Sequence, residues 1–107
     1  MTKQKEYKSQ QAVTEQLHTA EGVLSTAQKL ISGDRREDYG PAKESFEHIA
    51  CYWSQFLGYT ITSRDVAMMM VLFKVAREAN SHKTDNLVDI AGYAALAEEC
   101  EVDEYVR

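Results

Sequence analysis

The chain has 107 residues, of which 44% are hydrophobic and 27% are charged, and its formal net charge is −5. These values are typical of a single soluble globular domain and argue against intrinsic disorder. The acidic balance disfavours broad electrostatic binding to nucleic acid or to an anionic membrane surface. The longest nearly apolar run, residues 66–75, is too short to span a bilayer. We therefore expect neither a nucleic-acid nor a membrane partner.

The cysteine content and the N-terminal residues indicate the cellular compartment in which the protein is expected. Cys51 and Cys100 form no CxxC pattern, so they predict two reduced core residues rather than a zinc site. The first residues contain no apolar segment of the kind that a secretory signal needs. We therefore expect a cytoplasmic protein.

The first predicted helix is long. Apolar residues recur at alternating spacings of four and three, which indicates a helix from about Lys5 to Ile31 with one apolar face. This stripe consists of Val13, Leu17, Ala20, Leu24, Ala27 and Ile31. Gly33 is expected to end the helix in a left-handed conformation. The polar residues 1–12 are expected to fray or to reach a second subunit.

The second predicted helix starts at Pro41, since proline suits a first helical turn, and ends at Gly58. Its apolar stripe consists of Phe46, Ile49, Ala50, Trp53, Phe56 and Leu57. Thr62 and Asp65 resemble a capping box at the start of the third helix.

The third predicted helix runs to about Ala79 and contains the sequence MMMVLF at residues 68–73. Because this run is apolar on every side, we expect the third helix to be the central, buried one.

The fourth predicted helix is rich in alanine, begins with Thr84 or Asp85 as its cap and runs to about Cys100. Its small residues allow another helix to approach closely, and residues 101–107 are expected to form a loose tail. Four helices with short connections predict a single all-α domain over residues 1–107, built as an antiparallel four-helix bundle with a long N-terminal helix.

Two pairs of acidic residues are candidates for metal binding. Asp85 and Asp89 are four residues apart and Glu44 and Glu47 are three apart, so each pair shares a helix face. Carboxylate pairs of this kind bind magnesium, often together with substrate phosphates. The spacing is equally compatible with a helix cap and solvated surface charges.

Basic and aromatic residues are candidates for contacts with a phosphorylated ligand. Lys74 and Arg77, near the end of the third helix, are suited to holding phosphate, to interacting with the helix dipole, or to pairing with acids of the fourth helix. Arg36 and Tyr39 precede a helix N-terminus, which attracts anions. Tyr39 and Trp53 are candidates for stacking on a base, and Trp53 equally for core packing. The sequence has no glycine-rich phosphate loop and no nucleophile motif.

The stretch from Arg36 to Leu96 resembles a family of small helical proteins of bacteriophages and prophages. The matching motif residues are Arg36, Tyr39, Gly40, Trp53, Ser54, Asp65, Met68, Met69, Lys74, Arg77, His82, Asp85, Asn86, Asp89, Gly92 and Tyr93. That family looks like a distant relative of the MazG-type nucleoside triphosphate pyrophosphohydrolases. Those enzymes are all-α oligomers that hold magnesium with an ExxE pair and an ExxD pair.

The resemblance implies a site on this chain. Glu44 and Glu47 would form the first magnesium-binding pair and Asp89 would end the second. Asn86 stands where the second pair has its first acid, Asp85 lies one residue earlier, and Asp65 is a further candidate acid. The ligand-binding set that the resemblance implies is Arg36, Tyr39, Trp53, Lys74, Arg77, His82, Asn86 and Tyr93.

Three functions follow as hypotheses. The first is a phage-type homo-oligomer that binds nucleotide phosphates, with magnesium-dependent pyrophosphohydrolysis as its candidate reaction. The second is a non-catalytic sponge that sequesters a nucleotide-derived immune signal of the host. The third is a helical interaction module whose long first helix pairs with a partner.

Overall fold

The computed structural model describes residues 18–33 and 42–100 of the chain. Within these residues there are four helices and no strand: α2 (Ala20–Ser32), α4 (Ala42–Leu57), α5 (Ser63–Asn80) and α6 (Thr84–Glu99). This part of the chain confirms the all-α prediction, and α4, α5 and α6 begin and end within a few residues of their expected bounds. The prediction of one continuous helix from Lys5 to Ile31 is wrong, because Thr19 is an extended N-cap and α2 begins at Ala20. Residues 5–17 of that predicted helix lie outside the described residues. The predicted arm at residues 1–12, Pro41 and the tail at 101–107 lie outside the described residues. None of the described helices is both long enough and apolar enough to cross a membrane.

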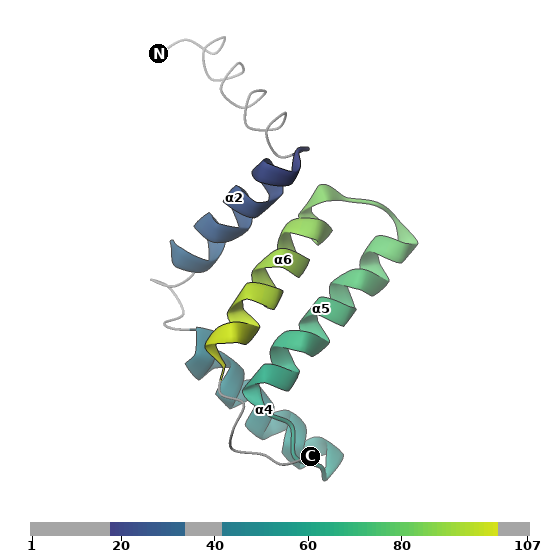
Figure 1. The fold of residues 1–107 in the computed structure, drawn as a ribbon. Coiled ribbons are helices and arrows are strands. Elements are labelled where there is room, and N and C mark those ends of the chain that lie inside the picture. The colour runs from purple at the N-terminus through teal and green to yellow at the C-terminus, as the bar shows by residue number, and fades with distance from the viewer. Residues whose placement is uncertain (1–17, 34–41, 101–107) are drawn as a thin grey trace, which may run out of the picture.

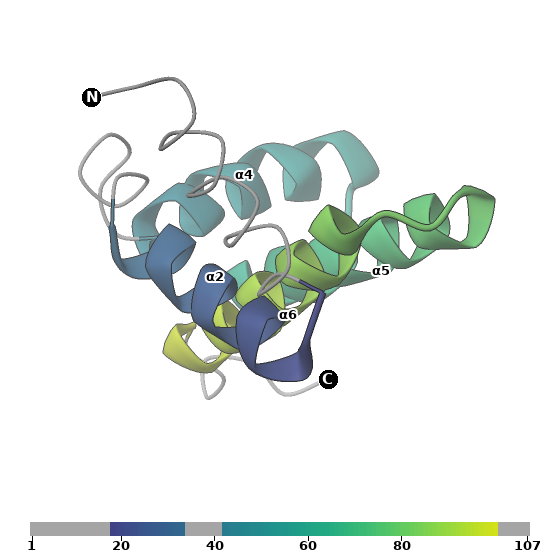
Figure 2. The same cartoon turned by 90° about the horizontal axis from the view of Figure 1, so that it is seen from above.

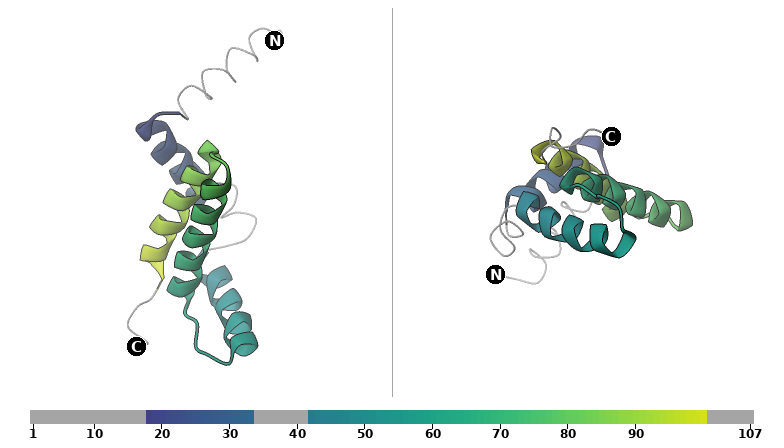
Figure 3. Two further views of the ribbon diagram at one scale, coloured as in Figure 1. Left: turned by 90° about the vertical axis from the view of Figure 1, so that its right-hand side faces the viewer. Right: turned by 90° about the horizontal axis from the view of Figure 1, so that it is seen from below.

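Helix α6 has the central position in the arrangement. It packs along α5 and α2 and also touches α4. Figure 1 shows α2, α6 and α5 side by side, with α4 crossing behind their lower ends. The view from above in Figure 2 and the side view in Figure 3 show α4 as a separate layer. The contacts are compatible with a bundle in which α4 packs across one end of α5 and α6.

The hydrophobic core lies at the end of the molecule where α4 crosses. It contains Phe46 and Ala50 of α4, Val66 and Ala67 of α5, Leu96 and Ala97 of α6, and Cys100. The residues from α5 all belong to its first half and those from α6 to its second half. The second half of α5 therefore extends beyond the layer that α4 provides.

This geometry overturns the prediction that the third helix is buried on every side. In the apolar run of α5, the exposed fraction is 48% for Met68, 64% for Leu72 and 48% for Phe73. The run is exposed because α4 packs on the first half of α5 and α6 covers one side of its second half. α6 takes the central place because its small residues admit a neighbour. A Cβ added at Gly92 would lie 3.6 Å from Cγ2 of Ile31, an ordinary packing distance.

The connection between α4 and α5 is fixed by local hydrogen bonds. The predicted capping box is confirmed: Oγ1 of Thr62 accepts from the Asp65 amide and Oδ2 of Asp65 accepts from the Thr62 amide, both at 2.9 Å. The Ser54 hydroxyl oxygen accepts from the Ile61 amide at 2.7 Å. Gly58 ends α4 as predicted, with a φ of +67° that an L side chain would strain. The carboxylate of Asp65 thus serves as a helix cap.

Two other predictions about caps are wrong in part or in full. Gly33 ends α2 as predicted, but its φ of −105° and ψ of −125° are not left-handed. Glycine is needed there because a Cβ would lie 2.7 Å from the Lys29 carbonyl oxygen. The N-cap of α6 is Lys83, which makes no side-chain capping bond, and Thr84 is the first helical residue. Oγ1 of Thr84 instead lies 3.1 Å from Nδ1 of His18, next to α2.

The two cysteines differ in their surroundings. Cys100 is buried in the core, as predicted, and burial raises the pKa of its thiol. Cys51 lies on the exposed side of α4, so the prediction of a second core cysteine is wrong.

Candidate functional site

The carboxylate of Glu78, in the last turns of α5, organises the turn that leads into α6. Its Oε1 accepts hydrogen bonds from the Lys83 amide at 3.0 Å and from Nδ2 of Asn86 at 3.2 Å. Its Oε2 pairs with Nδ1 of His82, one helical turn later. The bond to His82, followed by that from the Lys83 amide, holds the pKa of the Glu78 carboxyl below its ordinary value. One carboxylate therefore fixes three residues of the turn.

Beside this turn the surface forms a hollow of about 510 Å³, which we call the α5–α6 hollow. It is lined by Phe73, Ala76, Arg77, Asn80, Ser81, Lys83 and Asn86. Two of the predicted ligand-binding residues, Arg77 and Asn86, are brought together here.

Asn86 is the buried polar group of the hollow, with an exposed fraction of 6%. Its Nδ2 donates to Oε1 of Glu78 and, at 3.4 Å, to the Ser81 carbonyl oxygen. Both partners are acceptors, so the amide has its nitrogen toward them and its oxygen on the other side. Within the described residues Oδ1 accepts no hydrogen bond.

Arg77 and Lys83 supply positive charge to the hollow. The guanidinium carbon of Arg77 lies 5.1 Å from the centre of the Phe73 ring, a cation–π contact that orients the side chain. The N-terminus of α6 at Lys83 favours an anion, whereas the C-terminus of α5 disfavours one. Because these backbone effects oppose each other, the charge of the hollow depends on its side chains: Arg77 and Lys83 line it, and the carboxylate of Glu78 lies behind Asn86.

Lys74 and Asp89, predicted for phosphate and for metal, form an ion pair instead, with Nζ and Oδ2 3.0 Å apart. This is the alternative in which the basic residues of the third helix pair with acids of the fourth. Asp89 and Tyr93 also border a small cavity of about 50 Å³ between α2 and α6, which is otherwise lined by apolar residues and Gly92. Of the predicted site residues, Arg77 and Asn86 thus lie at the α5–α6 hollow, whereas Asp89 and Tyr93 lie at the small cavity between α2 and α6.

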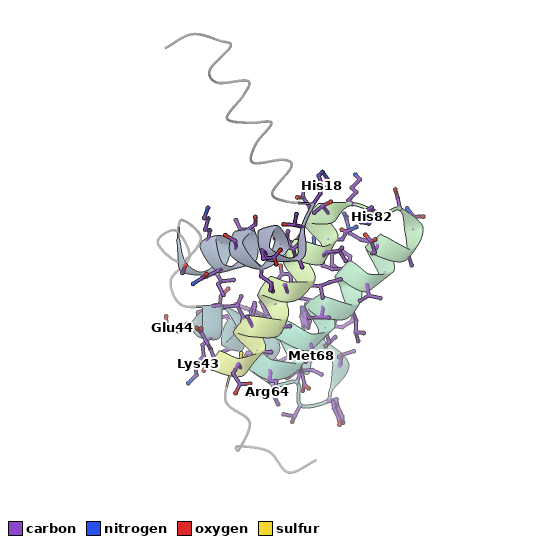
Figure 4. The ribbon with its side chains drawn as sticks, turned by 45° about the horizontal axis from the view of Figure 1, so that its top comes forward. His18, Lys43, Glu44, Arg64, Met68 and His82 are labelled. Carbon is purple, nitrogen blue, oxygen red and sulfur yellow. The ribbon has the colours of Figure 1, made fainter. Side chains whose placement is uncertain are left out.

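The four predicted magnesium ligands are not brought together within one chain. Glu44 and Glu47 lie exposed on α4, and Figure 4 shows Glu44 at the opposite end of the molecule from His82. Residues 18–33 and 42–100 contain no group of three or more His, Cys, Asp or Glu side chains able to hold a metal ion. The physical reason is that α4 packs on the first half of α5, whereas Asp85 lies in the first turn of α6, beside the end of α5.

The remaining predicted ligand residues have other surroundings. Trp53 packs against the core, and the Tyr93 ring centre lies 6.2 Å from that of Phe46. His82 is exposed and paired with Glu78. Arg36 and Tyr39 lie outside the described residues.

Sequence reasoning missed the roles of Phe73, Glu78 and Lys83. The spacing of four between Glu78 and His82 was an available signal, because such residues are neighbours on a helix. Lys83 could be found only from the position of the turn, since no motif marks it.

Comparison with known proteins identifies relatives in bacteriophages. Residues 22–101 match the family described as Domain of unknown function (DUF6378). The Gene 55 protein of Mycobacterium phage L5 is 45% identical over 87 residues, which cover 79% of this chain and 56% of that protein. The Gene 55 protein of Mycobacterium phage D29 is 40% identical over 80 residues, covering 74% and 53%. The chain thus spans about half the length of these relatives, and no solved structure matches it.

These matches confirm the predicted resemblance to small phage proteins, while the likeness to MazG-type enzymes stays a prediction. Because the family match covers most of the chain, the protein belongs to the family described as Domain of unknown function (DUF6378).

Proposed function

We propose that this protein binds a nucleotide-type anion in the α5–α6 hollow and acts as a phage protein in the host cytoplasm. The observation that carries the proposal is the pairing of two cations, Arg77 and Lys83, with a buried amide in one hollow of about 510 Å³. This volume is in the range of small-molecule sites. Arginine suits the bidentate recognition of phosphate, and lysine adds a point charge.

Binding without turnover is the form of this function that the geometry supports better. A magnesium-dependent hydrolysis needs several carboxylates around the metal, and the described acids of one chain do not fit such a centre. Asp89 is engaged by Lys74 at 3.0 Å, and Glu44 lies at the other end of the molecule. Sequestration of a nucleotide-derived signal therefore ranks above pyrophosphohydrolysis.

The test is a thermal-shift and calorimetry panel of nucleoside phosphates and cyclic dinucleotides, with and without magnesium. A ligand at about 100 times its Kd adds about 2.7 kcal/mol, which raises Tm by on the order of 10 °C in a domain of this size. Arg77→Gln is expected to weaken binding at least tenfold, because it removes a charge-assisted contact. Lys29→Gln is the matched control, since Lys29 is an exposed cation on α2, away from the hollow.

Chromatography of the bound ligand then separates the two forms of the function. An intact ligand supports sequestration, and a ligand cleaved only with magnesium supports hydrolysis. If no nucleotide raises Tm, or if Arg77→Gln binds as tightly as Lys29→Gln, the proposal is wrong.

A second candidate function rests on the outer side of α5. Met68, Met69, Leu72, Phe73 and Val75 are all more than a third exposed there, a surface that we call the α5 apolar face. Contiguous apolar surface of this kind marks interaction sites. We propose that a second copy of the chain covers it, in keeping with the predicted homo-oligomer.

A further inference from the structure

We infer that the α5–α6 hollow selects nucleotides whose base carries an amino group, because Asn86 presents a fixed hydrogen-bond acceptor to the ligand. This inference rests on the proposed function and adds a ligand class to it. The hollow then recognises two features at once: an anionic group at Arg77 and Lys83, and an N–H donor at Oδ1 of Asn86.

The Asn86 amide has one favourable orientation. Turning the amide over would place its oxygen against Oε1 of Glu78 and the Ser81 carbonyl oxygen, which are both acceptors at 3.2 and 3.4 Å from Nδ2. Two such contacts would be repulsive, so the nitrogen must point to them. The oxygen is then the only polar atom of this side chain left for a ligand.

The orientation of the Asn86 amide is held by Glu78, whose carboxylate has further partners of its own. Glu78 receives the Lys83 amide at 3.0 Å and pairs with His82, so its carboxylate cannot readily turn away from Asn86. Glu78 is therefore a positioning residue, which acts on the ligand through Asn86.

An unpaired acceptor at Asn86 makes the free energy of binding depend on the ligand's donors. Asn86 is 6% exposed, and a buried acceptor that stays unpaired when a ligand closes the hollow costs free energy. A ligand with a donor at this place recovers that loss, whereas an analogue without the donor does not. The expected discrimination is about tenfold in Kd, the effect of one hydrogen bond in a buried site.

The experiment measures Kd by calorimetry for three pairs of nucleoside monophosphates. Adenosine is compared with purine riboside, guanosine with inosine, and cytidine with uridine, because the second member of each pair lacks the amino group. At least one pair is expected to show a ratio of about ten or more. A ratio within twofold for all three pairs, or absence of binding by all six monophosphates, overturns the inference, whereas the proposed function fails only if no nucleotide of the full panel binds.

Two variants separate positioning from general binding. Glu78→Gln is expected to lower the ratio, because a glutamine amide can turn its nitrogen toward Asn86 and then only the Ser81 carbonyl, at 3.4 Å from Nδ2, holds the Asn86 orientation. Arg77→Gln is expected to weaken both members of a pair equally and to leave the ratio unchanged. If Glu78→Gln keeps the full ratio, Asn86 is not positioned by Glu78 and the inference is wrong.

Discussion

At the scale of single residues, Glu78 connects the turn after α5 to the start of α6. Three groups from the end of α5 and the start of α6 contact its carboxylate, and two of them belong to residues that line the α5–α6 hollow. The ionised form accepts all of these bonds, which is why the pKa of the carboxyl lies below its ordinary value.

The lowered pKa of Glu78 predicts how stability depends on pH. A carboxyl whose folded pKa is depressed stabilises the fold fully above its unfolded pKa, about 4.3, and this contribution is lost as the pH falls through the lower folded value. We expect Glu78→Gln to be less stable than the parent at pH 6 and closer to it at pH 3. Urea unfolding at both pH values measures this difference, and an equal gap at both would contradict it.

At the scale of helices, α6 begins without a side-chain cap. Its N-cap residue is Lys83, although serine, threonine, aspartate and asparagine are the residues that stabilise this position. Lys83 is unfavourable for the start of α6 but lines the hollow, so we interpret its lysine side chain as serving binding and not stability.

Lys83→Ser is therefore expected to change stability and binding in opposite directions. The serine hydroxyl can accept a hydrogen bond from the first turn of α6, which adds about 1 kcal/mol to the free energy of unfolding. Loss of the lysine charge weakens the binding of the nucleotide identified in the panel. Chemical denaturation and calorimetry on the same variant measure both effects, and Thr19→Ala, which removes the α2 cap, is the control that should only destabilise.

The sequence predicts the helices better than it predicts the site, and the reason is the range of the interactions. The capping box at Thr62 and the stop at Gly58 depend on neighbouring residues, so they can be read from the sequence. The pairing of Lys74 with Asp89 depends on how α5 packs on α6, and the separation of Glu44 from His82 depends on how α4 crosses the other helices. Nothing in the spacing of single motifs determines that crossing.

At the scale of the whole molecule, the α5 apolar face and the hollow lie on the same helix. Phe73 belongs to both, with an exposed fraction of 48% and a ring beside Arg77. A second copy packed on this face would therefore border the hollow and reduce its access to solvent.

A pair of matched variants tests which surface supports self-association. Leu72 of α5 and Leu24 of α2 are both 64% exposed, so an aspartate at either place changes the surface to a similar extent. We expect Leu72→Asp to reduce the mass measured by light scattering to that of one chain and Leu24→Asp to leave it unchanged. The reverse result would favour an interface through the first helix, and a parent protein that is already a single chain would contradict both.

Because the hydrophobic core lies at one end of the molecule, the segment that forms the hollow at the other end is expected to open more often than the core. The turn between α5 and α6 lies beyond α4, and the second half of α5 has α6 as its main neighbour among the described helices. Segments with few buried contacts open more often than the core, on timescales that amide hydrogen exchange records. We therefore expect the amides around the α5–α6 hollow to exchange faster than those of the core, and a bound ligand to slow this exchange by holding α5 and α6 together.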